Sequence, residues 1–578
     1  MRHALVGLVV VSAVVSACGG ARSPRPSLVS TAEQSQYQRT GRYDEAVRLC
    51  HDFARAYDHV RCDEIGRTVE DRPLLALRIA RRPNLPMIYI QAAIHAGEIE
   101  GKDAGFVFLR DLLDGKVAPG ALDAVSIVFV PVVNPDGHER FGPNHRPNQR
   151  GPLEMGFRTN AARLNLNRDF VKADAPETQA VLGLLRTTDL VLFVDLHTTD
   201  GAKFEHDIST VVSPYAPRAD GLDEAAHALS THLQQRLTAL GHLPLPFYPS
   251  FNDENDPASG FSAGEAPPRF GNYYMASRGR LALLVETHSW RTYPERAKST
   301  YHTLQIVLEH AIEHARGWRE LSEAVSRADA ALAGKPVTLL WKMTTRSREL
   351  EFRGYAYEKR TSELTTGTWL VYDEQTPQIW KVPYFEEVEP SVTVTAPGAG
   401  YIIDGGFAPL VARVLAHHGI TFTAIRGEPR VAVEAYRATK ATFGAPYEGR
   451  QRATITGAWA AETRTLERGA IFVPIAQPTA RLVMHLFEPA LPDSLAQWGH
   501  FNVVFERKEY MEPYVVEEVA RAMLAADPAL RAAFDAALAA DPELAKSAEL
   551  RRDFFYRRHP AWDERVELLP VYRTATAP

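Results

Sequence analysis

Four short apolar runs constrain the fold of this chain more than any other feature of its sequence. They lie at residues 87–93, 125–133, 190–196 and 281–285. Near-continuous apolar runs of this length are typical of strands that are buried on both faces. Helical patterns occur between and after them, at about 101–113, 222–240 and 294–327. We therefore expect an α/β fold with a mixed, largely parallel sheet that helices cover on both faces.

Polar residues follow each of these runs at the point where the strand should end. His95 and Glu98 follow the first run, and the turn Asn-Pro-Asp-Gly at 134–137 follows the second. His197 ends the third run, and Glu286 ends the fourth. In open α/β sheets ligands bind at the carboxyl ends of strands, so we expect these side chains to converge on one crevice.

Three of these side chains form a set that can bind a metal. A His-x-x-Glu pair such as His95 and Glu98 is common by chance and is weak evidence alone. His197 adds a third ligand from a separate strand. Two imidazoles and one carboxylate, with a fourth position open to water, form the catalytic zinc pattern. His288 also follows a strand, and we expect it to have a structural role rather than to bind the metal.

The order of motifs along residues 37–330 resembles the zinc carboxypeptidase family, the M14-type metallopeptidases. The motifs that carry the resemblance are His95-Ala-Gly-Glu98, Asn134-Pro-Asp-Gly137, Arg158-Thr-Asn160 with Asn167-Arg168, Asp195-Leu-His197 and Val285-Glu286-Thr287. The resemblance implies one Zn²⁺ per chain, bound by His95, Glu98 and His197. It also implies a zinc metallopeptidase that hydrolyses C-terminal peptide bonds of peptides or proteins.

The resemblance assigns a role to four further residues. Glu286 would act as the general base toward water and then pass the proton to the leaving amine. Arg158 would stabilise the developing oxyanion. Arg150 and Arg163 lie nearby in the sequence, so they leave this role open to another arginine. The pair Asn167 and Arg168 would hold the terminal carboxylate of the substrate, a planar anion that suits a guanidinium group.

The chain departs from the family pattern behind the first zinc histidine. Asn165 occupies the position where the family usually has an aspartate, and an amide accepts a hydrogen bond without supplying a charge. The mobile active-site tyrosine of the family is not fixed by spacing, and Tyr273 and Tyr274 are candidates. The floor of the specificity pocket is also open, with Asp207 and Arg278 as candidates.

Other functions are compatible with a zinc site of this type. One is an amide deacylase of the succinylglutamate desuccinylase or aspartoacylase type, and a narrower variant is a peptidase of cell-wall peptides. A lipid-anchored binding protein with a disabled site is a third, which the retained ligands and Glu286 argue against. The net charge of −6 argues against general nucleic-acid binding, for which we would expect a basic stripe.

The N-terminus predicts export. Residues 1–18 have a short apolar run and then Val-Ser-Ala-Cys, which resembles the bacterial lipobox of a lipoprotein signal peptide. This implies a lipid on Cys18 and a place in the bacterial cell envelope; ordinary secretion with cleavage nearby is the alternative. Residues 19–36 form a spacer. Cys50 and Cys62 either form a disulfide or are two buried thiols.

The length of 578 residues exceeds that of one ordinary domain. We assign residues 37–333 to a zinc carboxypeptidase-like catalytic domain. Residues 334–578 form an accessory region, in which we expect short strands over 335–388, a strand–helix–strand segment over 401–425, and Ala-rich helices from 514 onward. The oligomeric state is not predicted.

Overall fold

The computed structural model describes residues 26–578. The predicted signal peptide, Cys18 and the first part of the spacer therefore lie outside the described residues. Among residues 26–578, every helix is either too short or too polar to cross a lipid bilayer.

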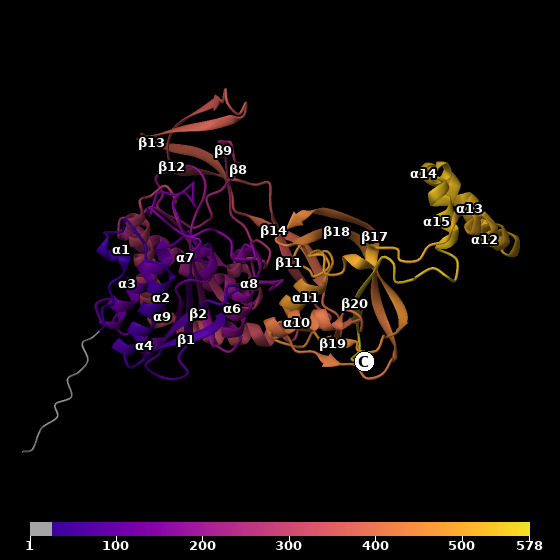
Figure 1. Ribbon diagram of the computed structural model, residues 1–578, viewed down its shortest axis with the longest axis horizontal. Helices are drawn as coiled ribbons and strands as arrows, with labels where there is room; N and C mark the ends of the chain where they lie inside the picture. The colour runs from indigo at the N-terminus through magenta and orange to yellow at the C-terminus, as the bar shows by residue number, and fades with distance from the viewer. Residues whose placement is uncertain (1–25) are drawn as a thin grey trace, which may run out of the picture.

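An eight-stranded mixed sheet forms the centre of the N-terminal half of the molecule (Figure 1). Its strands lie in the order β1-β2-β4-β3-β5-β10-β6-β7. Their bounds are Val60–Arg67 (β1), Pro73–Ile79 (β2), Met87–Ala92 (β3), Ser126–Val130 (β4), Leu190–Thr198 (β5), Ile208–Ser213 (β6), Pro244–Leu245 (β7) and Leu281–Thr287 (β10). The four predicted apolar runs form β3, β4, β5 and β10, which are adjacent and parallel. Their carboxyl ends therefore meet at one edge, as predicted.

Helices cover both faces of this sheet. Alternate residues of β3 divide between two apolar clusters, with Met87 and Tyr89 in one and Ile88 and Ile90 in the other. On the Ile88 side pack α2 (Tyr43–Ala56), α3 (Glu100–Leu113), α7 (Leu222–Ala239) and α9 (Tyr293–Asp329). On the Tyr89 side pack α6 (Pro176–Arg186) and α8 (Gly271–Ser277). The predicted α/β class is confirmed.

A disulfide joins the first helix of this layer to the edge of the sheet. Cys50 on α2 and Cys62 on β1 are bonded, with their Cα atoms 5.4 Å apart. The disulfide alternative is therefore the one that the structure shows.

A long β-ribbon extends from one side of the body, at the top of Figure 1. It consists of β12 (Arg348–Thr361) and β13 (Thr368–Phe385), and β13 pairs in parallel with β9 (Asp256–Ser262), beside β8 (Phe251–Asp253). The strands predicted over 335–388 are present, but β12 and β13 are long rather than short. Phe352 and Trp380 are buried in the inner part, whereas the outer part is exposed, so the apolar alternation that marks a strand fades along the ribbon.

A second, six-stranded sheet lies beside the first, in the order β16-β19-β15-β20-β17-β18. Its strands are β15 (Gly400–Ile403), β16 (Thr423–Ala424), β17 (Arg430–Tyr447), β18 (Arg450–Thr465), β19 (Ile471–Pro474) and β20 (Leu568–Thr574). Helices α10 (Ala408–His418) and α11 (Ala480–Phe487) pack against it. Earlier in the sequence than this sheet, β11 (Pro336–Met343) pairs with β14 (Val388–Thr395). The predicted strand, helix and strand over 401–425 correspond to β15, α10 and β16.

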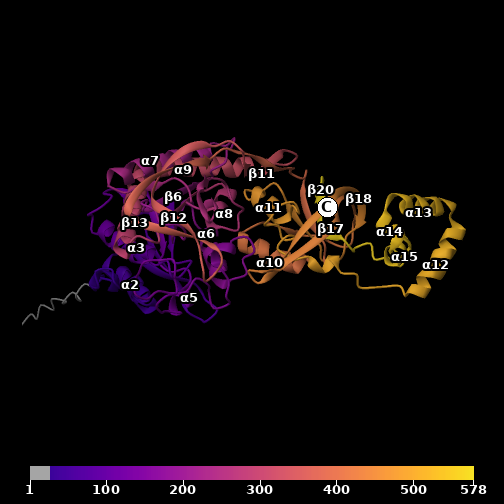
Figure 2. The same cartoon turned by 90° about the horizontal axis from the view of Figure 1, so that it is seen from above.

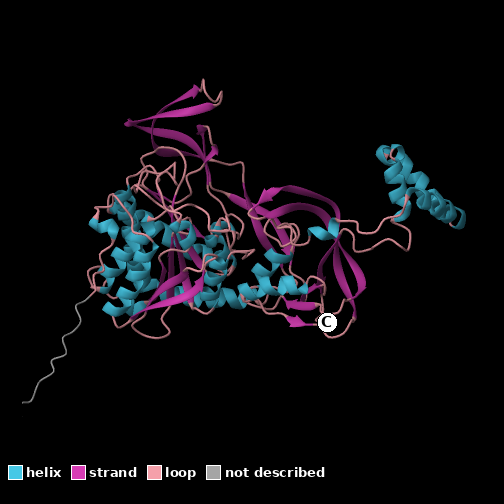
Figure 3. Cartoon of the chain, in the orientation of Figure 1, coloured by secondary structure: helices cyan, strands magenta, loops and turns pink. Residues whose placement is uncertain are grey.

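Four helices late in the sequence form a separate module. They are α12 (Pro513–Ala526), α13 (Pro528–Ala540), α14 (Pro542–Lys546) and α15 (Ala548–Tyr556). Asp527 and Asp541 each cap a helix that begins at the following proline, so Asp-Pro pairs set the breaks between helices. Figure 3 shows the module as helix only, and Figure 2 shows it in a row with the second sheet and the N-terminal half.

Candidate active site

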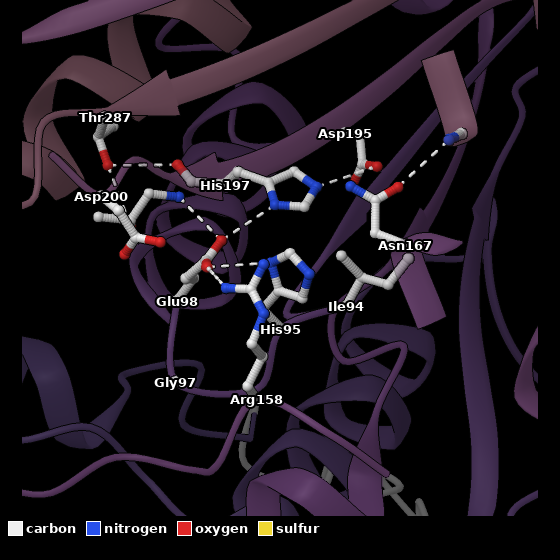
Figure 4. A network of polar contacts seen from close by, with 12 residues as sticks. Ile94, His95, Gly97, Glu98, Arg158, Asn167, Asp195, His197, Asp200 and Thr287 are labelled. Atoms are coloured by element: carbon white, nitrogen blue, oxygen red, sulfur yellow. Dashed lines mark hydrogen bonds and ion pairs between the residues drawn. The ribbon is translucent and has the colours of Figure 1, made fainter. Parts of the chain in front are cut away.

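All the residues predicted for the site line one cavity of about 440 Å³. It opens at the carboxyl edge of β3, β5 and β10, where Figure 4 shows the polar network. The predicted residues that line it are His95, Glu98, Arg158, Asn167, Arg168, His197 and Glu286. The structure thus brings together every side chain to which the sequence analysis gave a role in the reaction.

Three ligand atoms meet at the base of this cavity. The Nδ1 atom of His95 lies 3.0 Å from Oε1 of Glu98, and Nδ1 of His197 lies 3.0 Å from Oε2 of the same carboxylate (Figure 4). One atom from each residue lies within 4.8 Å of the other two, and all three side chains are buried. Two imidazole nitrogens and a carboxylate at these distances fit a zinc ion.

The outer nitrogen of each histidine has a partner. Nε2 of His95 lies 3.0 Å from Oδ1 of Asn165, and Nε2 of His197 lies 3.1 Å from Oδ2 of Asp195. The backbone N–H of Asn167 donates to the same Oδ1 atom, which identifies it as the amide oxygen. Nε2 of His95 therefore carries the hydrogen, and Nδ1 presents its lone pair to a metal. The donor set and the partners behind it both suit zinc.

A buried arginine that the sequence analysis missed contacts the metal-binding carboxylate. Nη2 of Arg146 lies 2.9 Å from Oε1 of Glu98 and 3.2 Å from Oδ1 of Asp200. Burial alone would raise the pKa of Glu98, but the charge of Arg146 and the contacts with the two imidazoles outweigh it and hold that pKa well below its usual range. Arg158 lies farther from Glu98, with Nη1 at 3.6 Å from Oε1. Arg146 belongs to none of the motifs, so only the fold reveals it.

Glu286 faces the metal ligands from β10. It is the register partner of His197 on β5, and its side chain is buried. Burial raises the pKa of Glu286 to about 8, and the charges of Glu98 and Asp195 act in the same direction while His197 opposes them. A carboxyl group that exchanges its proton near neutral pH is suited to general acid–base catalysis.

A short helical turn presents the predicted anion-binding pair. Asn167 and Arg168 lie in η1 (Leu166–Arg168), and the Asn165 side chain caps this turn. The guanidinium of Arg168 stacks over the ring of Phe270 at 4.3 Å. The Oδ1 atom of Asn167 accepts the N–H of Gly271 at 3.2 Å (Figure 4). Both side chains are thus held in place by the N-terminal end of α8.

The Asn-Pro-Asp-Gly turn supports the site without lining it. The Asn134 side chain accepts the N–H of Gly137 and begins α5 (Pro135–Glu139). Its Nδ2 donates to the carbonyl of Ile94 at 3.4 Å and to the carbonyl of Arg158 at 3.3 Å. The turn therefore joins the backbone beside a metal ligand to the backbone of the cavity arginine.

The tyrosines divide between the cavity and the core. Tyr274 is fully buried away from the cavity, whereas Tyr273 lines it and donates its hydroxyl to the carbonyl of Gly264. Tyr248, which the sequence analysis did not consider, also lines the cavity and is 40% exposed. Desolvation within the cavity and the charge of Glu286 raise the pKa of Tyr248, so its hydroxyl stays protonated.

Other candidates lie outside the cavity lining. Asp207 is paired with His242, and Arg278 donates to the hydroxyl of Tyr274. His288 stacks on Phe204 at 3.8 Å between ring centroids, consistent with a structural role.

Comparison with known proteins identifies part of this chain. Residues 46–242 match the family model Peptidase_M14, described as zinc carboxypeptidase. Carboxypeptidase D of Rattus norvegicus is 25% identical over 289 residues, which are 47% of this chain and 20% of that protein. Carboxypeptidase Z of Homo sapiens is 26% identical over 200 residues, which are 27% of this chain and 30% of that protein. The chain therefore spans well under half the length of these relatives.

Solved structures include metallo-carboxypeptidases with partial overlap. One from Burkholderia cenocepacia has 20% identity and a TM-score of 0.35, covering 46% of this chain and 68% of that chain. One from Pseudomonas aeruginosa, in complex with (2-guanidinoethylmercapto)succinic acid, has 18% identity and a TM-score of 0.36, covering 47% and 69%. Residues 46–242 therefore form a domain of the zinc carboxypeptidase family, the M14-type metallopeptidases.

Proposed function

We propose that this protein is a zinc-dependent metallocarboxypeptidase that hydrolyses C-terminal peptide bonds. The observation that carries the proposal is the set of residues that line one cavity. A zinc-type donor set, a buried carboxyl group with a raised pKa and a pair of anion-binding side chains all line it. A substrate that is held by its terminal carboxylate would therefore have its last peptide bond next to the metal ligands.

The residues of the chain divide the chemistry among them. Zinc bound by His95, Glu98 and His197 would supply Lewis-acid activation of water and of the scissile carbonyl. Arg168 and Asn167 bind the terminal carboxylate and orient the substrate. Arg158 donates to the oxygen on which negative charge develops.

Glu286 then moves the proton. In its ionised form the carboxylate takes a proton from the attacking water, and in its protonated form it gives this proton to the amine that leaves. The amide deacylase alternative is not favoured, because the matching family and relatives are carboxypeptidases.

A peptide ladder tests the proposal. Purified protein loaded with zinc is mixed with peptides that have either a free or an amidated C-terminus, and the products are followed by mass spectrometry. We expect the free peptides to lose residues stepwise from the C-terminus, and the amidated peptides to be cleaved poorly because the carboxylate clamp has no anion to bind. Glu286→Gln should retain zinc and lose about 10²- to 10⁴-fold in rate.

Three results would contradict the proposal. One is internal cleavage, the second is release of small acyl groups only, and the third is an unchanged rate in Glu286→Gln.

A further inference from the structure

A hairpin of the C-terminal sheet reaches the back of the active site. Strands β17 and β18 are joined by Glu448 and Gly449, with Tyr447 and Arg450 as the last register pair. At this tip, Oε2 of Glu448 accepts the backbone N–H of Asn165 at 2.8 Å. A side chain from the accessory region thus contacts the residue that lies behind a metal ligand.

Asn165 contacts both His95 and the Asn167–Arg168 pair. Its Oδ1 atom accepts from Nε2 of His95 at 3.0 Å and from the N–H of Asn167 at 3.1 Å. Its carbonyl accepts the N–H of Arg168 at 3.0 Å. A displacement of Asn165 would therefore move the zinc histidine and the carboxylate clamp together.

The conformation of the hairpin tip favours a role for the Glu448 side chain. Glu448 has φ = 49° and Gly449 has φ = 75°, so both central residues of the turn are left-handed. Two-residue turns of this kind favour Asn-Gly, because Asn tolerates positive φ better than Glu does. The chain therefore places a residue of poor local propensity where its carboxylate touches the active-site loop, a kind of strain that is concentrated at functional sites.

Neighbouring contacts hold the tip against the catalytic half. The guanidinium of Arg450 forms two hydrogen bonds with the carboxylate of Asp174, at 2.8 and 2.5 Å. On the other side of the turn, Tyr447 stacks on Trp498 of the C-terminal region with ring centroids 6.0 Å apart, and the Trp498 ring in turn lies 5.9 Å from Nζ of Lys172 in the catalytic half. These contacts fix the distance between the hairpin and the Asn165 loop, so Glu448 acts from a rigid support.

We propose that Glu448 is a positioning residue through which the C-terminal sheet completes the active site. It holds Asn165 in place, and Asn165 in turn orients His95 and the Asn167–Arg168 clamp. The part of the inference that concerns the clamp rests on the proposed carboxypeptidase function. The part that concerns His95 needs only that the site binds zinc.

Two substitutions separate positioning from folding. Glu448→Asn suits the left-handed turn but is one methylene shorter and loses the contact with Asn165, whereas Glu448→Gln keeps an acceptor of the same length. We load the full chain with Zn²⁺ and measure the rate at which a chelator removes the metal. Glu448→Asn should lose zinc about three- to tenfold faster than the parent, and Glu448→Gln should stay within about twofold. The midpoint temperature of thermal unfolding of Glu448→Asn should not be lower than that of the parent.

A control variant addresses the interface as a whole. Arg450→Ala removes the neighbouring contacts to Asp174 but keeps the Glu448 carboxylate that accepts the N–H of Asn165, so it should lower thermal stability while speeding zinc loss less than Glu448→Asn does. Zinc retention in Glu448→Asn equal to the parent, or equally fast loss in both Glu448 variants, would overturn the inference.

Catalysis provides the second readout. With free-carboxylate peptides, Glu448→Asn should raise KM more than it lowers kcat, because the clamp binds the substrate in its ground state. A KM equal to the parent's would overturn the clamp part. If the parent cleaves no peptide, the proposed function fails, while the chelator experiment still decides the part that concerns His95.

Discussion

The two zinc-type histidines are polarised differently. His197 has the carboxylate of Asp195 behind it, whereas His95 has the neutral amide of Asn165. A carboxylate behind an imidazole raises the basicity of the ligand more than an amide does. Glu448 therefore supports His95, the histidine with the weaker partner behind its imidazole. Correct placement of the imidazole matters most there.

This asymmetry predicts opposite effects of two isosteric substitutions. Asn165→Asp adds a charge behind His95 and should slow the loss of zinc to a chelator, by up to about tenfold. Asp195→Asn removes the charge behind His197 and should speed the loss by a similar factor. Metal release followed by absorbance of a zinc indicator measures both rates. Equal rates in the two variants would contradict the assignment of these partners.

Side chains of the site were predictable from the sequence where they follow strands. His95, His197 and Glu286 each come at the end of an apolar run, so the run itself places them at the sheet edge. Arg146 and Glu448 have no such signal. Arg146 reaches the site from a loop and Glu448 from a distant hairpin, so their partners can be identified only in the folded structure.

At the scale of elements, α10 ends in a histidine that is buried against the catalytic half. Nε2 of His418 lies 2.8 Å from the carbonyl of Val171, which can only accept, so Nε2 carries the hydrogen. Nδ1 then accepts the hydroxyl of Tyr274 at 2.8 Å, and Arg278 donates to that hydroxyl. Burial lowers the pKa of His418 to about 3, with the nearby positive charge of Arg278 as a further cause.

This contact should make stability depend on pH. The unfolded chain binds the proton below about pH 6.5, whereas the folded protein does so only near pH 3. Stability from this group is therefore fully present above about pH 7 and falls by about 1.4 kcal/mol per pH unit below pH 6.5. His418→Gln removes the titration. Urea unfolding at several pH values should show a shallower decline in that variant, and an unchanged slope would contradict a neutral His418 in the folded protein.

The elements of the central sheet were more predictable than the hairpins. The predicted helices end within one or two residues of α3, α7 and α9, because their apolar faces are continuous along the sheet. The hairpin β17–β18 was not predicted. Its outer residues, such as Phe443 at 44% exposure, are only partly covered, so burial does not impose a regular alternation on its sequence.

At the scale of the whole molecule, one apolar cluster crosses the predicted boundary at residue 334. It contains Val181 and Met275 of the catalytic half together with Val414 and Leu482 of the C-terminal region. The face of the central sheet that carries α6 and α8 therefore has the second sheet and its helices as its cover. A catalytic half on its own would expose this surface to water.

Two deletions test this arrangement. A chain that ends at residue 333 should aggregate or lack a cooperative unfolding transition. Removal of residues 506–566, which include the helical module, should leave the rest folded when about four glycines join the ends. The N–H of Glu567 already donates to the carbonyl of Val504 at 2.9 Å, so the linker spans almost no distance. Calorimetry and zinc content report both outcomes. A stable, zinc-binding chain of residues 26–333 would contradict the shared core.

The position of β20 makes the second sheet depend on a strand that lies late in the sequence. Residues 568–574 form a strand between β15 and β17, in the interior of the second sheet. The inner part of β17, at residues 434–437, pairs with β20, so the base of the hairpin that carries Glu448 has no neighbour on that side until this strand has emerged. A growing chain that already contains His95, Glu98 and His197 therefore lacks part of the sheet that supports Asn165, and we expect the site to take its final form only after β20 has inserted.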